Sequence, residues 1–319
     1  MNAPDVLATV FTPAVMDRFA NQREPSETAS ARLKILSAAD VDGVDEGTRR
    51  YNRLLCARRD AWREYLTSAS HHGVLDGDVI ARLTGTDDDN FRSALSECMG
   101  CWLLTGPLGL TLRARPAGRD RAVIDLGVQQ PDGDINIEVK SPYAPVPQAS
   151  TWWGGDHSHL LEGALNEANR QFPKDGKNVL MIVPLVEMPI LAGRAPFINA
   201  FYGDDRIVFT VDRVTGREVG EPENRFITDG KFLKLWPKEP RDTREPRYTR
   251  VGAVVRLREG YRETGDGDDF RVTVTRHWFV LHNPNSPQPI PTGMWGDCPQ
   301  FVEDGDVMRW TDDKPVMGY

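Results

Sequence analysis

Hydrophobic side chains recur at helical spacing in the first 104 residues of the chain and at strand spacing after them. A long helix is predicted from Glu46 to Ser68 by five apolar residues at helical spacing: Tyr51, Leu54, Leu55, Trp62 and Leu66. A second helix is predicted from Phe91 to Leu104, because the Asp-rich run before it supplies an N-terminal cap. Residues 1–88 are therefore expected to form an N-terminal helical region.

From residue 108 onward, apolar and polar residues alternate in the manner of β-strands. The predicted elements are strands at 108–116, 121–130 and 134–142, a helix at 158–172 and a buried strand at 178–186. Further strands, expected to form a β-rich C-terminal extension, are predicted at 206–214, 251–259 and 270–282. The order helix, three strands, helix, strand predicts an α/β fold for the second region, residues 89–319.

Residues 121–142 are expected to form a hairpin with one apolar and one polar face. Asp132 and Gly133 fit the two central positions of a type I′ turn. Counting outward from this turn places Asp125 opposite Lys140 and diagonal to Glu138. The apolar face would carry Ile124, Leu126, Val128, Ile135, Ile137 and Val139, and the polar face Asp125, Gly127, Gln129, Asn136, Glu138 and Lys140.

The polar face of this hairpin has the chemistry of a cation site. Mg²⁺ prefers oxygen ligands and commonly takes one or two carboxylates together with water and substrate phosphate oxygens. Asp125 and Glu138 are the expected ligands, with the backbone carbonyl of Val139 as a third and Mn²⁺ as an alternative ion. Lys140 would stabilise charge on a phosphate or help to activate the attacking water.

Glu97 is a charged residue in a predicted helix that is apolar nearly all round. Such a charge needs a partner. Small neighbours on the helix, Gly100 among them, would let it approach the sheet and bring the Glu97 carboxylate to the metal. The alternative is that Glu97 reaches solvent or pairs with an arginine such as Arg92.

These elements and residues together resemble the PD-(D/E)XK nuclease superfamily, over residues 88–186. The resemblance implies a restriction-endonuclease-like core and catalytic roles for Asp125, Glu138 and Lys140, with Glu97 as the acidic residue of the preceding helix. Gln171 resembles the polar residue that some members carry on the following helix. The Pro131-Asp132 dipeptide is interpreted as a chance match to the Pro-Asp of the family motif, because it lies in the turn and too close to Glu138. The implied activity is Mg²⁺-dependent hydrolysis of phosphodiester bonds by an endonuclease or exonuclease, with DNA favoured over RNA.

The formal net charge of −8 over 319 residues excludes a protein that coats nucleic acid by bulk electrostatics. Contact with nucleic acid would have to be local. Two basic stretches offer either such a contact or merely a solvated face: Arg49, Arg50, Arg53, Arg58, Arg59 and Arg63, then Arg241, Arg244, Arg247, Arg250, Arg256 and Arg258. With no membrane span, no leader and only four scattered cysteines, a cytoplasmic protein that does not bind membranes is expected.

Other residues admit a functional and a plainer interpretation. Cys98 and Cys101 lack the partners of a zinc site and fit core packing better. In the loop after the hairpin, His157 and His159 could contact phosphate or lie exposed to solvent. Trp152 and Trp153 could stack on bases or hold the loop against the protein.

Three classes of function remain open. The first is the nuclease; the second is a non-catalytic protein that keeps the fold and binds nucleic acid or a protein partner. The third is a nuclease used as a toxin or defence effector, held inactive by a partner. The hairpin charges could also be a solvated surface with weak cross-strand ion pairs. A homodimer or a regulatory protein partner is compatible with all of these.

Overall fold

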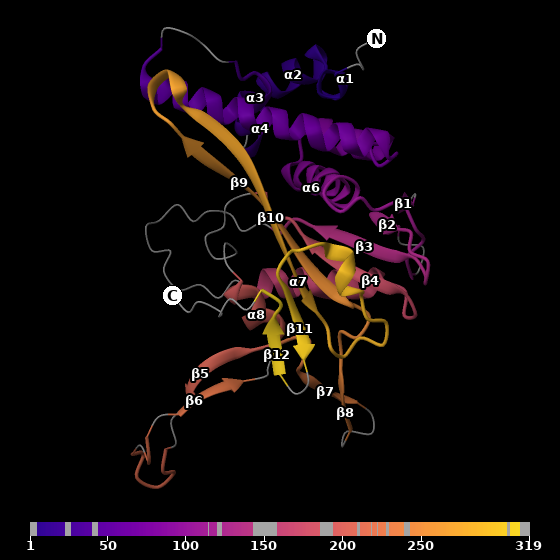
Figure 1. Cartoon of the computed structure of the whole chain (residues 1–319), viewed down its shortest axis with the longest axis vertical. Helices are drawn as coiled ribbons and strands as arrows, with labels where there is room; N and C mark the ends of the chain where they lie inside the picture. The colour runs from indigo at the N-terminus through magenta and orange to yellow at the C-terminus, as the bar shows by residue number, and fades with distance from the viewer. Residues whose placement is uncertain are drawn as a thin grey trace.

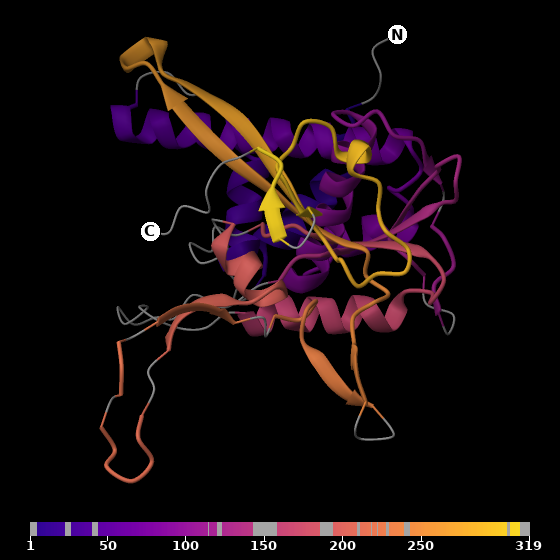
Figure 2. The ribbon, with the colours of Figure 1, turned by 60° about the horizontal axis from the view of Figure 1, so that its bottom comes forward.

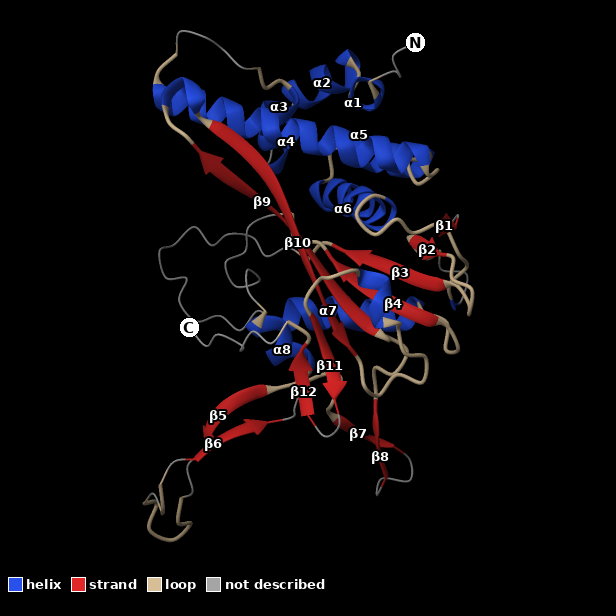
Figure 3. Cartoon of the chain, in the orientation of Figure 1, coloured by secondary structure: helices blue, strands red, loops and turns tan. Residues whose placement is uncertain are grey.

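An eight-stranded mixed sheet forms the centre of the protein, and helices cover both of its faces (Figures 1 and 3). The computed structural model describes residues 5–22, 27–39, 44–113, 115–119, 123–142, 158–185, 194–208, 211–217, 219–221, 223–227, 230–238, 243–304 and 307–312. Within these ranges the predicted α/β class is confirmed.

The sheet strands are β1 (Leu112–Arg113), β2 (Leu126–Val128), β3 (Ile135–Lys140), β4 (Lys177–Ile182), β9 (Ala253–Thr264), β10 (Arg271–His282), β11 (Gln300–Asp304) and β12 (Val307–Trp310). They lie side by side in this order. β3, β4 and β9 run parallel to one another, while β2 is antiparallel to β3 and β10 is antiparallel to β9. Among the described residues of the predicted strand at 108–116, Leu112 and Arg113 form β1.

The helices are α1 (Val6–Val10), α2 (Pro13–Ala20), α3 (Glu27–Leu36), α4 (Glu46–His71), α5 (Gly77–Thr84), α6 (Asp88–Thr105), α7 (Ser158–Gln171) and α8 (Ala195–Phe201). Helix α4 begins where the sequence pattern predicts, because the Asp45 side chain accepts the Thr48 N–H at its N-terminus. The order α6, β1, β2, β3, α7, β4 is the predicted order of helix, three strands, helix and strand.

The two faces of the sheet are packed by different helices. One hydrophobic cluster joins α4 and α6 to Ile135, Ile137 and Val139 of β3, and the other joins α7 and α8 to Leu180 and Ile182 of β4. Because side chains of a strand alternate between faces, Asn136, Glu138 and Lys140 belong to the α7 face. The cluster on the α6 face also includes residues of α1 and α2, so the hydrophobic core is continuous across residue 88.

Helix α6 approaches the sheet closely at Gly100. A Cβ atom at this position would lie 3.0 Å from Met181 Sδ, 3.2 Å from Leu126 Cδ1 and 3.4 Å from Val139 Cγ2. The prediction that small residues allow this approach is confirmed at Gly100. The close contact packs α6 directly against β2, β3 and β4.

The long hairpin of β9 and β10 extends beyond the sheet and lies along α4 (Figure 1). Arg276 of β10 donates to the Tyr65 hydroxyl at 2.8 Å and pairs with Glu64 at 2.6 Å. The Tyr65 hydroxyl also contacts the carboxylate of Glu259 on β9. This hairpin therefore connects the N-terminal helices to the centre of the sheet.

The first basic stretch, on α4, makes contacts within the chain. Arg50 pairs with Asp266 at the tip of the long hairpin at 2.9 Å, and Arg53 donates to the Phe270 carbonyl at 2.6 Å. In the second stretch, Arg256 is buried and Arg250 donates to the Asn169 carbonyl, while Arg241 lies outside the described residues.

Two smaller hairpins project from the body of the protein (Figure 2). They pair β5 (Asp204–Val208) with β6 (Glu223–Ile227), and β7 (Leu235–Lys238) with β8 (Thr243–Pro246). No helix in the described part of the chain has the length and apolar content that a membrane span requires.

Candidate active site

The register of the β2–β3 hairpin differs from the predicted one by two residues. Leu126 pairs with Ile137 and Val128 pairs with Ile135, so the turn is centred on Pro131 and Asp132, one residue earlier than predicted. Gly133 donates its N–H to the Gln130 carbonyl at 3.2 Å and closes this turn. The prediction that Asp125 lies opposite Lys140 is therefore wrong, since the same register sets Asp125 beside Glu138. A shift by two residues leaves each side chain of β3 on its predicted face, because the alternation has a period of two.

β2 begins only at Leu126, and the two residues before it leave the regular strand. Asp125 lies in a bend, and its Oδ2 accepts the backbone N–H of Val139 at 2.8 Å. Ile124 packs among the residues of α7, not beside Leu126 as predicted. The alternation is broken here, and the Asp125 carboxylate occupies the edge of β3 where a pairing strand would otherwise continue.

Glu138 and Lys140 form an ion pair on the α7 face of the sheet. The distance from Lys140 Nζ to Glu138 Oε1 is 2.9 Å, and the Glu138 side chain is only 2% exposed. Lys140 Nζ also lies 2.7 Å from Glu167 Oε1 on α7. The second oxygen of Glu138, Oε2, is buried and has no hydrogen-bond partner among the described residues.

The backbone carbonyl of Val139 faces the same edge of β3 as Asp125. Lys140 accepts the Val183 N–H at 2.8 Å, so its carbonyl points toward β4. Carbonyls of successive strand residues point to opposite edges, and the Val139 carbonyl therefore points away from β4. This orientation agrees with the predicted ligand role, which stays a prediction.

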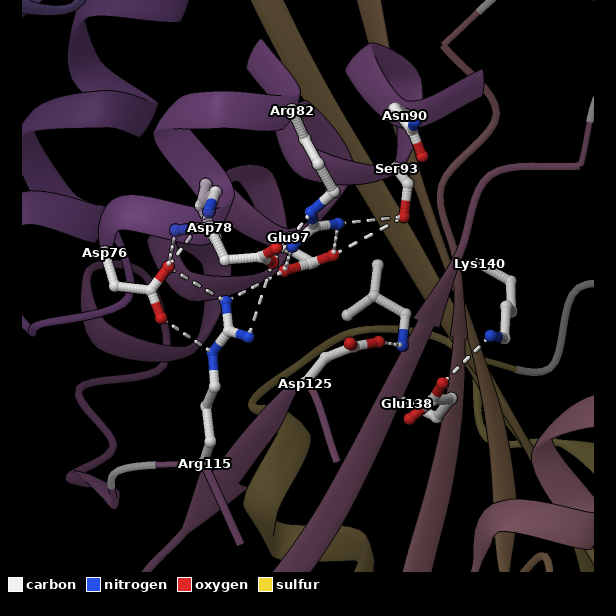
Figure 4. Close-up of polar contacts among 12 residues, drawn as sticks. Asp76, Asp78, Arg82, Asn90, Ser93, Glu97, Arg115, Asp125, Glu138 and Lys140 are labelled. Carbon is white, nitrogen blue, oxygen red and sulfur yellow. Dashed lines mark hydrogen bonds and ion pairs between the residues drawn. The ribbon is translucent and has the colours of Figure 1, made fainter. Parts of the chain in front are cut away.

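Glu97 is paired with arginine side chains, not exposed to solvent (Figure 4). Arg82 of α5 holds both oxygens of this carboxylate, at 2.6 Å and 2.9 Å. Arg115 Nη2 lies 3.7 Å from Glu97 Oε2. Arg92, the partner suggested from the sequence, pairs with Asp89 instead.

The carboxylates of the site affect one another electrostatically. Burial raises the pKa of Asp125 well above its ordinary value, and repulsion from Glu138 and Glu97 raises it further. Burial also raises the pKa of Glu138, although Lys140 opposes this shift. A cation bound between these carboxylates would relieve their mutual repulsion.

Lys140 is held in its charged form. Burial lowers the pKa of this ammonium group, but the carboxylates of Glu138 and Glu167 outweigh burial and raise it overall. Similarly, the hydrogen bonds that Arg82 donates to Glu97 raise the pKa of Arg82. Both side chains therefore supply positive charge to the site at neutral pH.

Two further predicted residues lie away from this cluster. Gln171 is on α7, one helical turn beyond Glu167, and none of the contacts of the described residues joins it to Glu138 or Lys140. Asp132 lies in the turn and pairs with Lys177 at 2.5 Å, in agreement with its interpretation as part of a chance match to the motif. Sequence reasoning missed Glu167, although it shares a helix face with Gln171.

The remaining candidates that lie within the described residues add no metal ligands. Cys98 and Cys101 are buried free thiols, and the described ranges contain no group of three or more His, Cys, Asp and Glu residues arranged to hold a metal ion. His159 is exposed in the first turn of α7. The other loop candidates, Trp152, Trp153 and His157, fall outside the described residues.

Comparison of the chain with protein-family models, curated proteins and solved structures finds no match. The function therefore has to be inferred from the chemistry of this site.

Proposed function

We propose that the protein is a metal-dependent nuclease that hydrolyses phosphodiester bonds, with DNA favoured over RNA by its resemblance to the PD-(D/E)XK superfamily. The core would be restriction-endonuclease-like and consist of α6, β1, β2, β3, α7 and β4, whose order agrees with that resemblance. Mg²⁺ is the expected ion, and Mn²⁺ an alternative.

The observation that carries this proposal is the buried, half-satisfied carboxylate of Glu138 next to Asp125. A buried carboxylate oxygen without a partner is costly, and a bound cation would supply the missing interaction. Two carboxylates and the Val139 carbonyl are also the hard oxygen donors that Mg²⁺ prefers. The donor set therefore fits a divalent cation that keeps several waters and a phosphate oxygen.

Each residue of the site has a separate task in such a reaction. Asp125 and Glu138 would hold the cation, which polarises the phosphate and lowers the pKa of a bound water. Lys140, charged and oriented by Glu138 and Glu167, would stabilise negative charge on the phosphate in the transition state. Its raised pKa favours this role over that of a general base, which must first lose its proton.

A second candidate function is a non-catalytic protein that binds nucleic acid or a partner through the same fold. The bidentate pairing of Glu97 with Arg82 favours it, because this carboxylate is then engaged within the protein. Binding of DNA without Mg²⁺ and without cleavage would support this alternative.

The test is a cleavage assay on plasmid DNA, linear duplex, single-stranded DNA and RNA, in Mg²⁺, Mn²⁺ or EDTA. Cleavage should require the ion and should be lost in Glu138→Gln. Asp132→Asn is the matched control, because its ion pair with Lys177 lies at the exposed turn. Absence of cleavage on every substrate in both ions, with a folded protein, would refute the proposed activity.

A further inference from the structure

Arg82 is fully engaged by carboxylates on two helices (Figure 4). Its Nε lies 3.0 Å from Asp78 Oδ2 within α5, and its two terminal nitrogens bind the two oxygens of Glu97 on α6. This fork geometry is the strongest arrangement that a guanidinium and a carboxylate adopt. Both oxygens of Glu97 are therefore occupied by the protein itself.

Glu138 and Asp125 differ from Glu97 in this respect. Glu138 Oε2 has no partner among the described residues, and the hydrogen bond from Val139 to Asp125 uses only Oδ2. The site therefore presents ligand oxygens for a cation at two of its three central carboxylates.

A second guanidinium makes the surroundings of Glu97 unfavourable for a metal ion. Arg115 lies 3.7 Å from Glu97 Oε2, 3.4 Å from Asp76 and 3.8 Å from Asp78. A divalent cation placed at Glu97 would meet the positive charges of both arginines, which repel it.

The charge of the whole cluster still leaves room for one ion. Six carboxylates face three cationic side chains in the contacts described above: Asp76, Asp78, Glu97, Asp125, Glu138 and Glu167 against Arg82, Arg115 and Lys140. The formal excess of three negative charges is largely neutralised by one divalent cation. Without Arg82 the formal excess would be four negative charges, which two divalent cations would neutralise.

We propose that Arg82, supplied by the N-terminal helix α5, takes the place of a second cation, so that the site binds one divalent ion at Asp125 and Glu138. This inference rests on the proposed function. Glu97 is then a positioning residue, which acts by holding Arg82 beside Asp125 and does not ligate the ion. Loss of Arg82 converts Glu97 into a metal ligand.

The experiment counts Mn²⁺ ions by calorimetric titration and electron paramagnetic resonance, which need no substrate. The wild type should bind one ion. Arg82→Gln should bind a second ion at least tenfold more tightly than any second ion in the wild type, a change of about 1.4 kcal/mol. The double variant Arg82→Gln/Glu97→Gln should return to one ion, because the additional ligand is gone.

Arg113→Gln is the matched control, since Arg113 pairs with Asp134 on the surface and should leave the count at one. Glu97→Gln provides a second measurement if Arg82→Gln does not fold, and it should keep the wild-type ion with its affinity unchanged within about threefold.

Two ions in the wild type, one ion in folded Arg82→Gln, or loss of the ion in Glu97→Gln would each overturn the inference. These results would leave the proposed metal site standing. A wild type that binds no ion would instead remove the metal-dependent function itself.

Discussion

Replacing Asp125 by Asn tests whether the site exists to hold a cation, even when the substrate is unknown. Asn keeps the size of the side chain and an oxygen that can accept the Val139 N–H, but it removes the charge. Weakening this hydrogen bond from charged to neutral costs about 1 kcal/mol. Two like charges separated by roughly 4 to 8 Å repel by about 2 to 4 kcal/mol at an effective dielectric constant of about 20.

Relief of repulsion should therefore outweigh the weakened hydrogen bond in the protein without metal. Because the pKa of Asp125 is raised in the folded protein, folding favours the protonated form of this carboxyl. Its contribution to the free energy of unfolding is complete at low pH and is lost as pH rises through the raised pKa. In EDTA at neutral pH, Asp125→Asn should hold or gain stability. The gain should disappear as pH is lowered toward about 4, where an ordinary aspartate in the unfolded chain also takes up a proton.

Thermal melting in EDTA and in millimolar Mg²⁺ provides the measurement. An ion at a hundred times its Kd stabilises the folded wild type by about 2.7 kcal/mol. This free energy corresponds to a rise in Tm on the order of 5 °C for a chain of this size. The rise should be much smaller in Asp125→Asn and unchanged in the Asp132→Asn control. Identical Mg²⁺ responses of the wild type and Asp125→Asn would refute the metal site.

Three further predictions concern the same site and its support. Lys140→Ala should lower the single-turnover cleavage rate by about 100-fold or more while Mg²⁺ still binds, and an unchanged rate would exclude this lysine from the reaction. Affinity for Mg²⁺, measured by titration between about pH 5 and pH 8, should fall as pH is lowered, because the pKa values of Asp125 and Glu138 are raised; a flat profile would contradict this. Gly100→Val should lower the free energy of unfolding in urea by about 1 to 3 kcal/mol, because its Cβ would lie 3.0 Å from Met181 Sδ. Gly163→Val is its control, since that Cβ meets nothing within 4 Å, and equal effects of the two substitutions would argue against close packing of α6.

The alternation of the sequence was sufficient to predict the faces of β3. Ile135, Ile137 and Val139 pack under α6, and Glu138 and Lys140 lie on the other face, as expected. The predicted register was wrong because the turn is centred on Pro131 and Asp132, one residue earlier than expected, and moving a turn by one residue shifts the strand pairing by two. Side-chain faces were insensitive to this error, since they repeat every two residues.

Residues contributed by other elements were beyond the reach of the sequence pattern. The partner of Glu97 is fifteen positions earlier, on α5, and the pairing depends on how two helices pack. Similarly, the choice of Glu167 over Gln171 depends on how far α7 is displaced along the sheet, which the helical period does not specify. Local periodicity predicts elements and faces, whereas contacts between elements require the tertiary structure.

The pairing of Arg82 with Glu97 also has a consequence for how this protein can change during evolution. Removing one member of a buried ion pair costs about 3 to 5 kcal/mol, because the other charge is left without a partner. In related chains, the residues at these two positions are therefore expected to change together. A sheet that acquired a different N-terminal region would lose Arg82 and retain the Glu97 charge. We thus expect residues 1–88 and the central sheet to be inherited as one unit, although their sequence patterns differ.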